Sequence, residues 1–475
     1  MDVSSSEVTA DRTMADGYDV IVAGAGLAGH VAALTAAEAG ATVCLLEKGD
    51  EYGGSSVRAG GGLVFVGTDR QREAGIDDSD DALRKDLTTA GGGVARAELI
   101  DAYVDNQLDT YEWMVARGVP FSLEQPTVPG GLARIHLTGR GVATRVLHDQ
   151  VEADDRITYR DRAAIRRLTR GAGGRVDTVE VRLDGADHTV RARRSVILTT
   201  GGFARGRALL RDFAPLWLDA VPMGGAHNTG DGIVLAQALG AGLADMPYVS
   251  ASFGASLLGG SDAVDEPILL YPNYRGAVIV NADGRRFANE EKNYKLLSRD
   301  TLEQPGGLAF TIFDEPIFQQ SDDRAIPMDY KAAHASGLVR RATSIAELAE
   351  MLSIDADALQ QTIDRYNRSV ADGVDQDFGR PIKYRDNPGG GLIATAPFYG
   401  YPTRPGLTST YAGVTVDASM QVRDVFGDAI PGLFAAGETV GGFHGAGYYS
   451  GTALGKAAVF GRIAGRIAGR DGGRP

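Results

Sequence analysis

The sequence predicts an α/β protein, because its first apolar segment alternates strand, helix and strand. Residues 18–24 (YDVIVAG) are short, apolar and rich in β-branched side chains, which is typical of a buried parallel strand. Residues 27–39 (LAGHVAALTAAEA) are rich in alanine, which favours a helix, and Gly40 supplies its C-cap. Residues 41–47 (ATVCLLE) predict a second strand. Together these segments form a βαβ unit, the building block of parallel sheets.

A glycine-rich turn at residues 24–29 (GAGLAG) joins the first strand to the helix as a complete G-x-G-x-x-G. The first glycine permits a tight turn, the second lets a pyrophosphate approach the backbone, and the third lets the helix pack close to the strand. Glu47 ends the second strand, where an acid binds a ribose hydroxyl in such units. The pattern therefore predicts a Rossmann-like dinucleotide-binding domain. Its expected contacts are Gly24, Gly26, Leu27, Ala28, Gly29 and Glu47.

Composition excludes several other classes of protein. The net charge of −14 disfavours a surface devoted to nucleic acid. The single cysteine, Cys44, excludes an intramolecular disulfide and any thiolate metal cluster, and the histidine spacing suggests no metal site. The N-terminus shows no secretory signal and no stretch is apolar enough to span a membrane, so we expect a cytoplasmic protein with a disordered lead-in at 1–16.

Further glycine-rich segments indicate a ligand longer than NAD. A second glycine loop follows the ribose-binding acid directly, which suits a ligand that continues past the first pyrophosphate turn, as FAD does. Three more such segments lie far downstream, at 199–202, 228–232 and 431–465. The additional residues expected to bind the cofactor are Lys48, Gly54, Ser55, Ser56, Gly60, Gly61, Gly62, Thr200, Gly201, Asn228, Gly230, Asp231, Gly437, Glu438, Gly451, Thr452, Ala453 and Leu454.

These motifs, in this order, resemble the fumarate reductase and succinate dehydrogenase flavoprotein family from about residue 17 onward. The resemblance implies an FAD domain built from 17–244 and 391–475, with a substrate capping domain at 245–390. The insert has its own helical pattern at 345–370. The loop at 53–58 lacks the histidine that carries flavin in membrane-bound members, so we expect noncovalent FAD. The resemblance also places Ala164 near the adenine. A second fingerprint for NAD(P)H is missing.

The chain departs from the dicarboxylate reductases of this family at four places. Their catalytic arginine, which follows R-F-x-N-E, falls on Tyr294, and their carboxylate-binding arginine falls on Tyr448. Their histidine is missing from 408–414, and their H-P-T segment is missing near 245–248. Replacing guanidinium by phenol removes a charge and a bidentate donor. Fumarate or succinate is therefore a poor substrate on this interpretation.

Residues 447–454 (GYYSGTAL) look more like the G-Y-x-S-G-T-S-L motif of 4-ene-forming 3-ketosteroid dehydrogenases. This resemblance implies a ketone α,β-desaturase acting on a cyclic or steroid-like 3-oxo compound. Tyr448 and a backbone N–H near Gly451 would bind the ketone oxygen and stabilise the enolate. Tyr294 would accept the α-proton as a tyrosinate, and the β-hydrogen would leave as hydride to flavin N5. Tyr449, Ser450 and His136 are the expected substrate-binding residues.

Several alternatives stay open. The same site would serve an ene-reductase in the reverse direction, fed by an external electron donor. A flavoprotein electron-transfer subunit of a larger complex is disfavoured by the missing attachment histidine and the missing carboxylate-binding residues. A nonenzymatic FAD-binding protein is disfavoured by the two tyrosines. His444 is expected to contact flavin or order its loop, and Asp231 to be structural or flavin-binding. Four arginines that could bind an acidic substituent are expected mainly on the solvated surface: Arg134, Arg140, Arg275 and Arg404.

Overall fold

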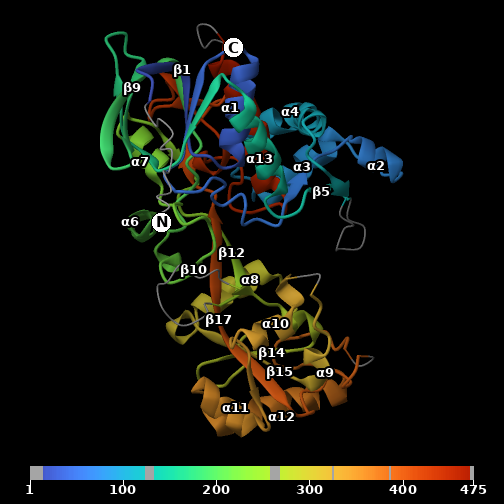
Figure 1. Ribbon diagram of the computed structural model, residues 1–475. Coiled ribbons are helices and arrows are strands. Elements are labelled where there is room, and N and C mark those ends of the chain that lie inside the picture. The colour runs from blue at the N-terminus through green and yellow to red at the C-terminus, as the bar shows by residue number, and fades with distance from the viewer. Residues whose placement is uncertain (1–13, 124–132, 257–267, 324–325, 385–386, 471–475) are drawn as a thin grey trace, which may run out of the picture. The chain divides into compact units, whose positions relative to one another are not determined.

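The computed structural model describes residues 14–123, 133–256, 268–323, 326–384 and 387–470 (Figure 1). Most of the expected lead-in at 1–16 therefore lies outside the described residues. The chain forms two compact units. The first comprises Met1–Phe213, Gly224–Val249 and Ser409–Pro475, and the second Ala214–Met223 and Ser250–Thr408. The second unit is thus larger than the inserted segment of 245–390 expected from the sequence.

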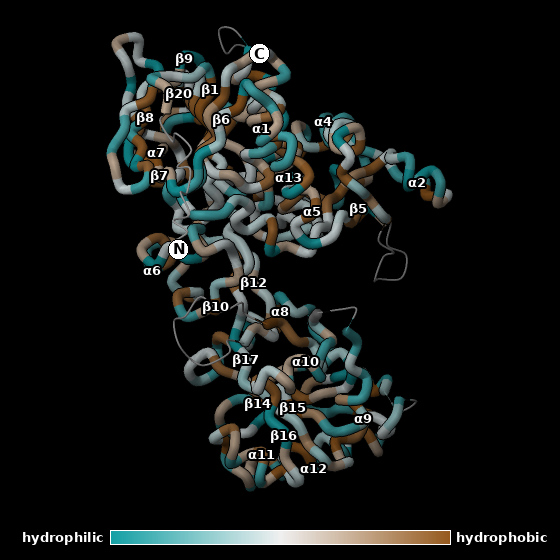
Figure 2. The backbone as a smooth tube through the Cα atoms, in the orientation of Figure 1, coloured by the Kyte–Doolittle hydropathy of each residue, from teal (hydrophilic) through white to brown (hydrophobic). Residues whose placement is uncertain are grey.

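A mostly parallel sheet forms the centre of the first unit. Its strands follow the order β19-β20-β9-β1-β2-β6, and β1 pairs in parallel with both β2 and β9. The expected strand–helix–strand unit is confirmed as β1, α1 and β2. Hydrophobic residues concentrate in these central strands (Figure 2). The bounds are β1 Gly17–Ala23, α1 Leu27–Glu38, β2 Val43–Leu46, β6 Ile157–Arg160, β9 Ala186–Leu198, β19 Gln421–Arg423 and β20 Ala429–Ala435.

Smaller elements surround this sheet in the first unit. The antiparallel strands β7 (Ala163–Arg170) and β8 (Val176–Leu183) extend it from β9, and β3 (Gly62–Val64), β5 (Ile135–Leu137) and β4 (Ser122–Leu123) form a separate small sheet. Two further strands, β11 (Leu243–Ala244) and β18 (Gly413–Val414), pair with each other. The remaining helices are α2 Asp69–Glu73, α3 Asp80–Ala90, α4 Ala97–Ala116, α5 Val142–Ala153, α6 Arg207–Phe213, α7 Asp231–Gln237 and α13 Thr452–Ala468.

Helices α1 and α13 approach each other closely because glycines face alanines across their contact. A Cβ atom added to Gly465 would lie 2.4 Å from the Ala32 carbonyl oxygen, and one added to Gly461 would lie 2.6 Å from that of Ala28. No larger side chain fits between the two backbones. The fingerprint helix α1 therefore packs directly against the C-terminal helix α13.

The second unit is built on a mainly antiparallel sheet in the order β13-β12-β17-β15-β14, with β10 and β16 also paired to β17. Its strands are β10 Val221–Pro222, β12 Val249–Ser256, β13 Ile268–Leu269, β14 Val278–Asn281, β15 Ala309–Asp314, β16 Arg340–Ala342 and β17 Phe398–Thr410. Its helices are α8 Tyr294–Leu302, α9 Glu315–Phe318, α10 Tyr330–Ala335, α11 Ile345–Leu352 and α12 Ala356–Asp372.

The helical pattern expected at 345–370 is confirmed and consists of two helices, α11 and α12. Ser353 ends α11 in a left-handed conformation, with φ of 58°. The side chain of Asp355 then accepts a hydrogen bond from the Ala358 N–H and begins α12. This capping carboxylate satisfies a backbone donor that a continuous helix would have bonded internally.

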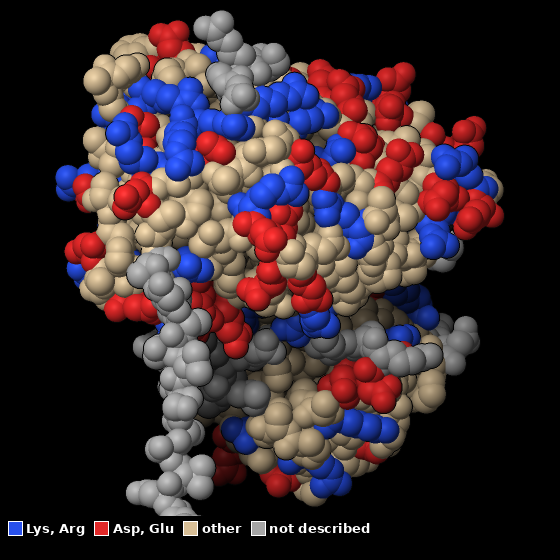
Figure 3. Space-filling view, turned by 45° about the horizontal axis from the view of Figure 1, so that its top comes forward, with Lys and Arg blue, Asp and Glu red and all other residues tan. Residues whose placement is uncertain are grey.

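Surface charges are mixed in sign on the face shown in Figure 3. Some arginines of the β7–β9 region are paired with acids, as in Arg182 with Asp187 at 2.8 Å and Arg191 with Asp177 at 3.2 Å. Within the described ranges, no helix combines the length and the apolar character needed to cross a membrane. The same residues contain no group of three or more potential ligands arranged to hold a metal ion.

The contact between α1 and α13 generates a stability prediction. Gly465→Leu is expected to lower the free energy of unfolding by about 3 kcal/mol, because the added side chain forces two backbones apart. Gly173→Ala is the control, since a Cβ atom there meets nothing within 4 Å, and its effect should stay within about 0.5 kcal/mol. Denaturant unfolding of the two variants measures both, and equal midpoints would contradict the role given to this contact.

Candidate active site

The fingerprint turn between β1 and α1 is closed by backbone contacts that only glycine allows. Gly24 has φ of +107°, and a Cβ atom there would lie 2.5 Å from the Thr199 carbonyl oxygen. A Cβ atom on Gly29 would lie 1.9 Å from the Gly24 carbonyl oxygen. The Thr199 hydroxyl donates to that same carbonyl at 2.8 Å. The turn therefore presents backbone at the positive end of a helix, which fits a dinucleotide pyrophosphate.

Glu47 is buried and braces this turn. Its Oε2 accepts the Ala25 N–H at 3.0 Å, and its Oε1 accepts the Gly49 N–H at 2.8 Å. The Ser56 hydroxyl oxygen similarly accepts the Leu27 N–H at 3.0 Å. The sequence indicated the importance of both residues but missed these backbone partners. Each Glu47 oxygen keeps a further lone pair, so the contact with a ribose hydroxyl stays a prediction.

Asn228 joins three of the glycine-rich segments. Its Nδ2 donates to the Ser55 hydroxyl at 3.1 Å and to Glu438 Oε2 at 2.9 Å. Glu438 Oε1 accepts the Thr410 N–H at 2.8 Å. Burial raises the pKa of Glu438 despite these donors. Gly201 lies beside the same amide, since a Cβ atom on it would be 3.3 Å from Nδ2. Segments more than 150 residues apart in sequence thus meet at one amide group.

Lys48 and Asp231 form an ion pair in the same region. Lys48 Nζ lies 2.7 Å from Asp231 Oδ2 and donates to the Thr229 hydroxyl at 2.8 Å. Burial acts to raise the pKa of Asp231, but the Lys48 ammonium and the Thr229 hydroxyl hold this pKa below its usual value. The Thr200 hydroxyl accepts the Gly232 N–H at 3.1 Å near the start of α7. Asp231 is thereby engaged in an ion pair within the fold, and its contact with the cofactor stays a prediction.

The other glycines expected at the cofactor lie at turns and strand ends. Gly437 has φ of +68°, and a Cβ atom on it would meet Ala28 at 2.9 Å. Gly230 and Gly451 are the left-handed N-caps of α7 and α13. Gly61 contacts Gly139, and Gly62 begins β3, whereas Gly54 and Gly60 face open space. Ala164 pairs with Arg182 between β7 and β8.

The N-terminus of α13 holds Tyr448. The Ala453 N–H donates to the Tyr448 hydroxyl at 3.4 Å, and the Tyr448 ring stacks on Tyr411 with ring centroids 6.1 Å apart. The Thr452 hydroxyl donates to the Tyr449 carbonyl at 2.5 Å and lies 3.0 Å from His444 Nε2. The helix dipole favours negative charge on the Tyr448 oxygen, which strengthens this phenol as a hydrogen-bond donor. Tyr411 was not predicted from the sequence.

Tyr449 points to a buried ion cluster. Arg134 donates to its hydroxyl at 3.4 Å. The guanidinium also donates to both oxygens of Asp78, at 2.6 and 2.7 Å, and to Asp86 at 2.6 Å. The side chain of Arg134 is only 1% exposed, so the surface position expected for it is wrong. Its guanidinium donors are used by Asp78 and Asp86, which disfavours binding of an acidic substituent of a substrate.

The remaining predicted residues of this group are more peripheral. Ser450 is exposed, and Leu454 packs on the core of the first unit. His136 is fully buried beside aromatic rings, with Nε2 at 2.8 Å from the Thr68 hydroxyl and Nδ1 at 2.9 Å from the Arg134 carbonyl. Burial lowers its pKa. This placement favours a packing role over the substrate contact that the sequence suggested.

Tyr294 begins α8 in the second unit. The preceding Asn293 caps the helix by accepting the Lys295 N–H at 2.9 Å. The Tyr294 ring stacks on Tyr271, with centroids 5.7 Å apart and an interplanar angle of 24°. The hydroxyl of Tyr271 lies 2.5 Å from that of Ser252 on β12. Tyr271 is an aromatic neighbour of Tyr294 that was not predicted from the sequence.

A buried charge network fixes the segment that leads to Tyr294. Arg286 donates to both oxygens of Glu290 at 2.7 Å and to Asp375 at 2.9 and 3.2 Å. Arg380 donates to the carbonyls of Asn273 and Ala277 at 2.8 and 3.0 Å. Although burial works against its charge, Glu290 and Asp375 raise the pKa of Arg286. These contacts hold the motif at 286–290 rigidly one turn before α8.

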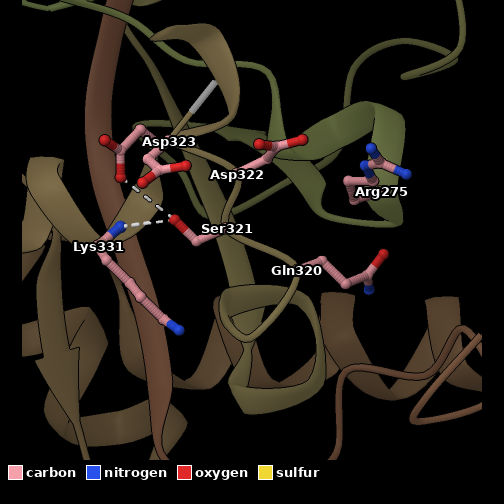
Figure 4. A pocket seen from close by; sticks show the side chains of 7 residues that line it. Arg275, Gln320, Ser321, Asp322, Asp323 and Lys331 are labelled. Carbon is pink, nitrogen blue, oxygen red and sulfur yellow. Dashed lines mark hydrogen bonds between the residues drawn. The ribbon is translucent and has the colours of Figure 1, made fainter. Parts of the chain in front are cut away.

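A surface hollow of about 600 Å³ lies elsewhere on the second unit (Figure 4). Two of its lining side chains serve local structure: the Ser321 hydroxyl donates to Asp329 and accepts the Lys331 N–H, and Asp329 caps α10. Arg275 is exposed at its edge. Its lining is Arg275, Gln320, Ser321, Asp322, Asp323, Asp329 and Lys331. These are not the residues that the motifs assign to chemistry.

The cluster around Arg134 generates a second prediction. Asp78→Asn removes the bidentate partner of a buried guanidinium and should lower the free energy of unfolding by about 3 kcal/mol. Asp187→Asn is the matched control, because its partner Arg182 is exposed, and its loss should be much smaller than that of Asp78→Asn. Denaturant unfolding compares them. Equal losses would show that burial does not govern these two ion pairs.

The comparisons with known proteins agree with this geometry. A model of the FAD binding domain family matches residues 19–454. The chain is 32% identical to a fumarate reductase (cytochrome) of Shewanella frigidimarina over 461 residues, covering 94% of the chain and 76% of the relative. Among solved structures it resembles the open conformation of a flavocytochrome c3 fumarate reductase, with a TM-score of 0.84, 28% identity and coverage of 96% and 78%.

A second solved structure connects the chain to steroid enzymes. This is 3-ketosteroid-Δ4-(5α)-dehydrogenase from Rhodococcus jostii RHA1 in complex with 4-androstene-3,17-dione, with a TM-score of 0.73, 27% identity and coverage of 98% and 99%. The match to the family model thus runs from the strand before the fingerprint turn into α13. The chain belongs to the FAD binding domain family and is an FAD-dependent oxidoreductase of the group that includes fumarate reductases and ketosteroid dehydrogenases.

Proposed function

We propose that this protein is an FAD-dependent ketone α,β-desaturase that acts on a cyclic or steroid-like 3-oxo compound. The observation that carries the proposal is that phenols replace guanidinium groups at two positions, Tyr294 and Tyr448. Arg134, one of four arginines considered for an acidic substituent, already donates to Asp78 and Asp86. A neutral carbonyl suits phenolic donors better than a dicarboxylate does.

Residues of the first unit would bind the noncovalent cofactor and the ketone. The fingerprint turn would take the pyrophosphate, and Asn228 with Glu438 would fix the segments that surround the rest of FAD. Tyr448 would donate to the ketone oxygen, aided by the N-terminus of α13 and the backbone near Gly451. Tyr449, held by Arg134, would line the substrate.

Tyr294 would move the proton. As the substrate loses its α-proton to the Tyr294 oxygen, negative charge develops on the ketone oxygen, where Tyr448 stabilises it. Bound FAD supplies the acceptor for the hydride that leaves the β-carbon. An external acceptor must later take the two electrons that leave the substrate with the hydride. The second unit would serve as the substrate cap.

The reverse reaction, reduction of an enone or of a fumarate-like acceptor, is the second candidate. Identity favours it, because a fumarate reductase is 32% identical to this chain and a 3-oxosteroid 1-dehydrogenase of Mycolicibacterium smegmatis 29%. In that direction Tyr294 donates the proton. Anaerobic mixing separates the two: bleaching of oxidised flavin by a saturated 3-oxo compound supports desaturation, whereas reoxidation of reduced flavin by an enone alone supports reduction.

The contacts of Asn228 with Ser55 and Glu438 generate a prediction about FAD. Asn228→Asp places a second carboxylate beside Glu438 and removes two amide donors, so affinity for FAD should fall about tenfold or more. Asn106→Asp is the control, because Asn106 lies on α4 and accepts from Arg466. Fluorescence titration of apoprotein with FAD measures both. Unchanged affinity in Asn228→Asp would remove this amide from the cofactor site.

The assignment of Tyr294 generates a prediction about turnover. Tyr294→Phe should keep the protein FAD-loaded and lower the rate of flavin reduction by a 3-oxo substrate at least about a hundredfold, since the proton acceptor is lost. Tyr274→Phe, on the same aromatic cluster, should change the rate much less. Anaerobic stopped-flow absorbance measures the rates. A near-normal rate in Tyr294→Phe would exclude this tyrosine from proton transfer.

A further inference from the structure

Two histidine rings form a hydrogen-bonded chain that ends at the fingerprint turn. His30 lies on the first part of α1 and is fully buried, and its Nδ1 is 2.8 Å from the Gly26 carbonyl oxygen. Its other ring nitrogen, Nε2, is 3.0 Å from Nδ1 of His148 on α5. The chain of contacts therefore reaches the N-terminus of α1, which is the end that suits the FAD pyrophosphate.

The carbonyl group determines which nitrogen of each ring carries a proton. A carbonyl oxygen only accepts hydrogen bonds, so Nδ1 of His30 is protonated and donates to Gly26. Burial lowers the pKa of His30 to about 4, so this ring is neutral at neutral pH. In a neutral ring the second nitrogen is an acceptor, and the Nδ1–H of His148 therefore donates to Nε2 of His30. The hydrogen bonds run in one direction, from His148 through His30 to Gly26.

The peptide unit between Gly26 and Leu27 is held at both of its polar atoms. Its carbonyl oxygen accepts from His30 Nδ1, and its N–H donates to the Ser56 hydroxyl at 3.0 Å. Because the unit is planar, these two contacts fix its orientation. Glycine has more backbone freedom than any other residue, so fixing its peptide before a ligand arrives removes an entropic cost from binding.

Aromatic neighbours hold His148 in place. The Tyr52 ring stacks on it with centroids 3.6 Å apart and an interplanar angle of 19°, and Tyr159 lies edge-on to it at 5.0 Å. Tyr52 directly precedes Gly53, whose N–H donates to the Ala25 carbonyl at 2.8 Å. The loop that packs on His148 is thus also bonded to the fingerprint turn.

We propose that His30 and His148 are positioning residues for FAD: the N–H of His148 selects the form of His30 that donates to Gly26, and so presents the fingerprint turn to the pyrophosphate in one orientation. A His30 proton placed on Nε2 instead would leave a bare Nδ1 facing a carbonyl oxygen, and the two acceptors would repel each other. The inference concerns the cofactor and holds for either direction of the proposed reaction.

The test compares FAD affinity within two pairs of variants of equal shape. Asparagine places an amide N–H where histidine has Nδ1, whereas leucine has the same branching and no donor. His148→Leu should bind FAD about tenfold more weakly than His148→Asn, and His30→Leu should be weaker than His30→Asn by a similar factor. Both members of a pair lose the imidazole ring and its aromatic contacts, so their difference measures the N–H. Fluorescence titration of the folded apoprotein with FAD gives the affinities.

His334→Leu is the matched control. His334 also directs Nδ1 at a backbone carbonyl, that of Val339 at 2.8 Å, but it lies on α10 in the second unit. Its FAD affinity should equal that of the wild type. The proposal is overturned if neither leucine variant binds FAD more weakly than its asparagine partner, or if His334→Leu weakens binding as much as they do. Thermal unfolding verifies that each variant is folded, and either pair alone decides the matter if the other is not.

A purely structural role for the two histidines predicts a different result. If they only joined α1 to α5, the leucine and asparagine variants would differ in the free energy of unfolding of the apoprotein but not in FAD affinity, and that outcome would also overturn the proposal. The titration needs no substrate. A failure of the proposed ketone chemistry is therefore distinguishable from a failure of this inference.

Discussion

The close contact of α1 with α13 is the constraint on which the first unit depends, because it brings both ends of the chain onto one sheet. Gly461 and Gly465 face the backbone of α1 with no side chain between. Gly437 is held against Ala28 in the same way. The C-terminal turn therefore meets the fingerprint helix at its first turn. Small residues build this contact between α1 and the C-terminal segment as much as hydrogen bonds do, which is one reason why glycine is abundant in the sequence.

In the second unit the equivalent constraint is electrostatic. A network of two guanidinium groups and two carboxylates is buried around the motif at 286–290. Such a network adds little net stability, since desolvation offsets the attraction between charges. It does permit one arrangement only, because any displaced member would leave a buried charge unpaired. That property suits a segment that holds the first residue of α8 in one place, as the proposed proton transfer requires.

Local features of both units could be predicted from the sequence, and long-range choices of partner could not. The fingerprint turn, β1, α1, β2 and α13 follow from glycine spacing and apolar runs, which act over a few residues. The break at Ser353 was also local, since Ser344 and Asp355 are N-cap residues. By contrast, the burial of Arg134 depends on Asp78, 56 residues away. No periodicity indicates which of several arginines a distant acid will select.

The exchange of guanidinium for phenol changes what the site can do as well as what it binds. A guanidinium group stays charged throughout the accessible pH range, so it attracts carboxylates whether or not reaction occurs. A phenol is neutral until a nearby positive charge or dipole makes its ionisation favourable. The α13 N-terminus offers such a dipole to Tyr448. Under the proposed mechanism, the two phenols act most strongly when charge develops on the substrate, which is the condition for lowering a barrier and not merely tightening binding.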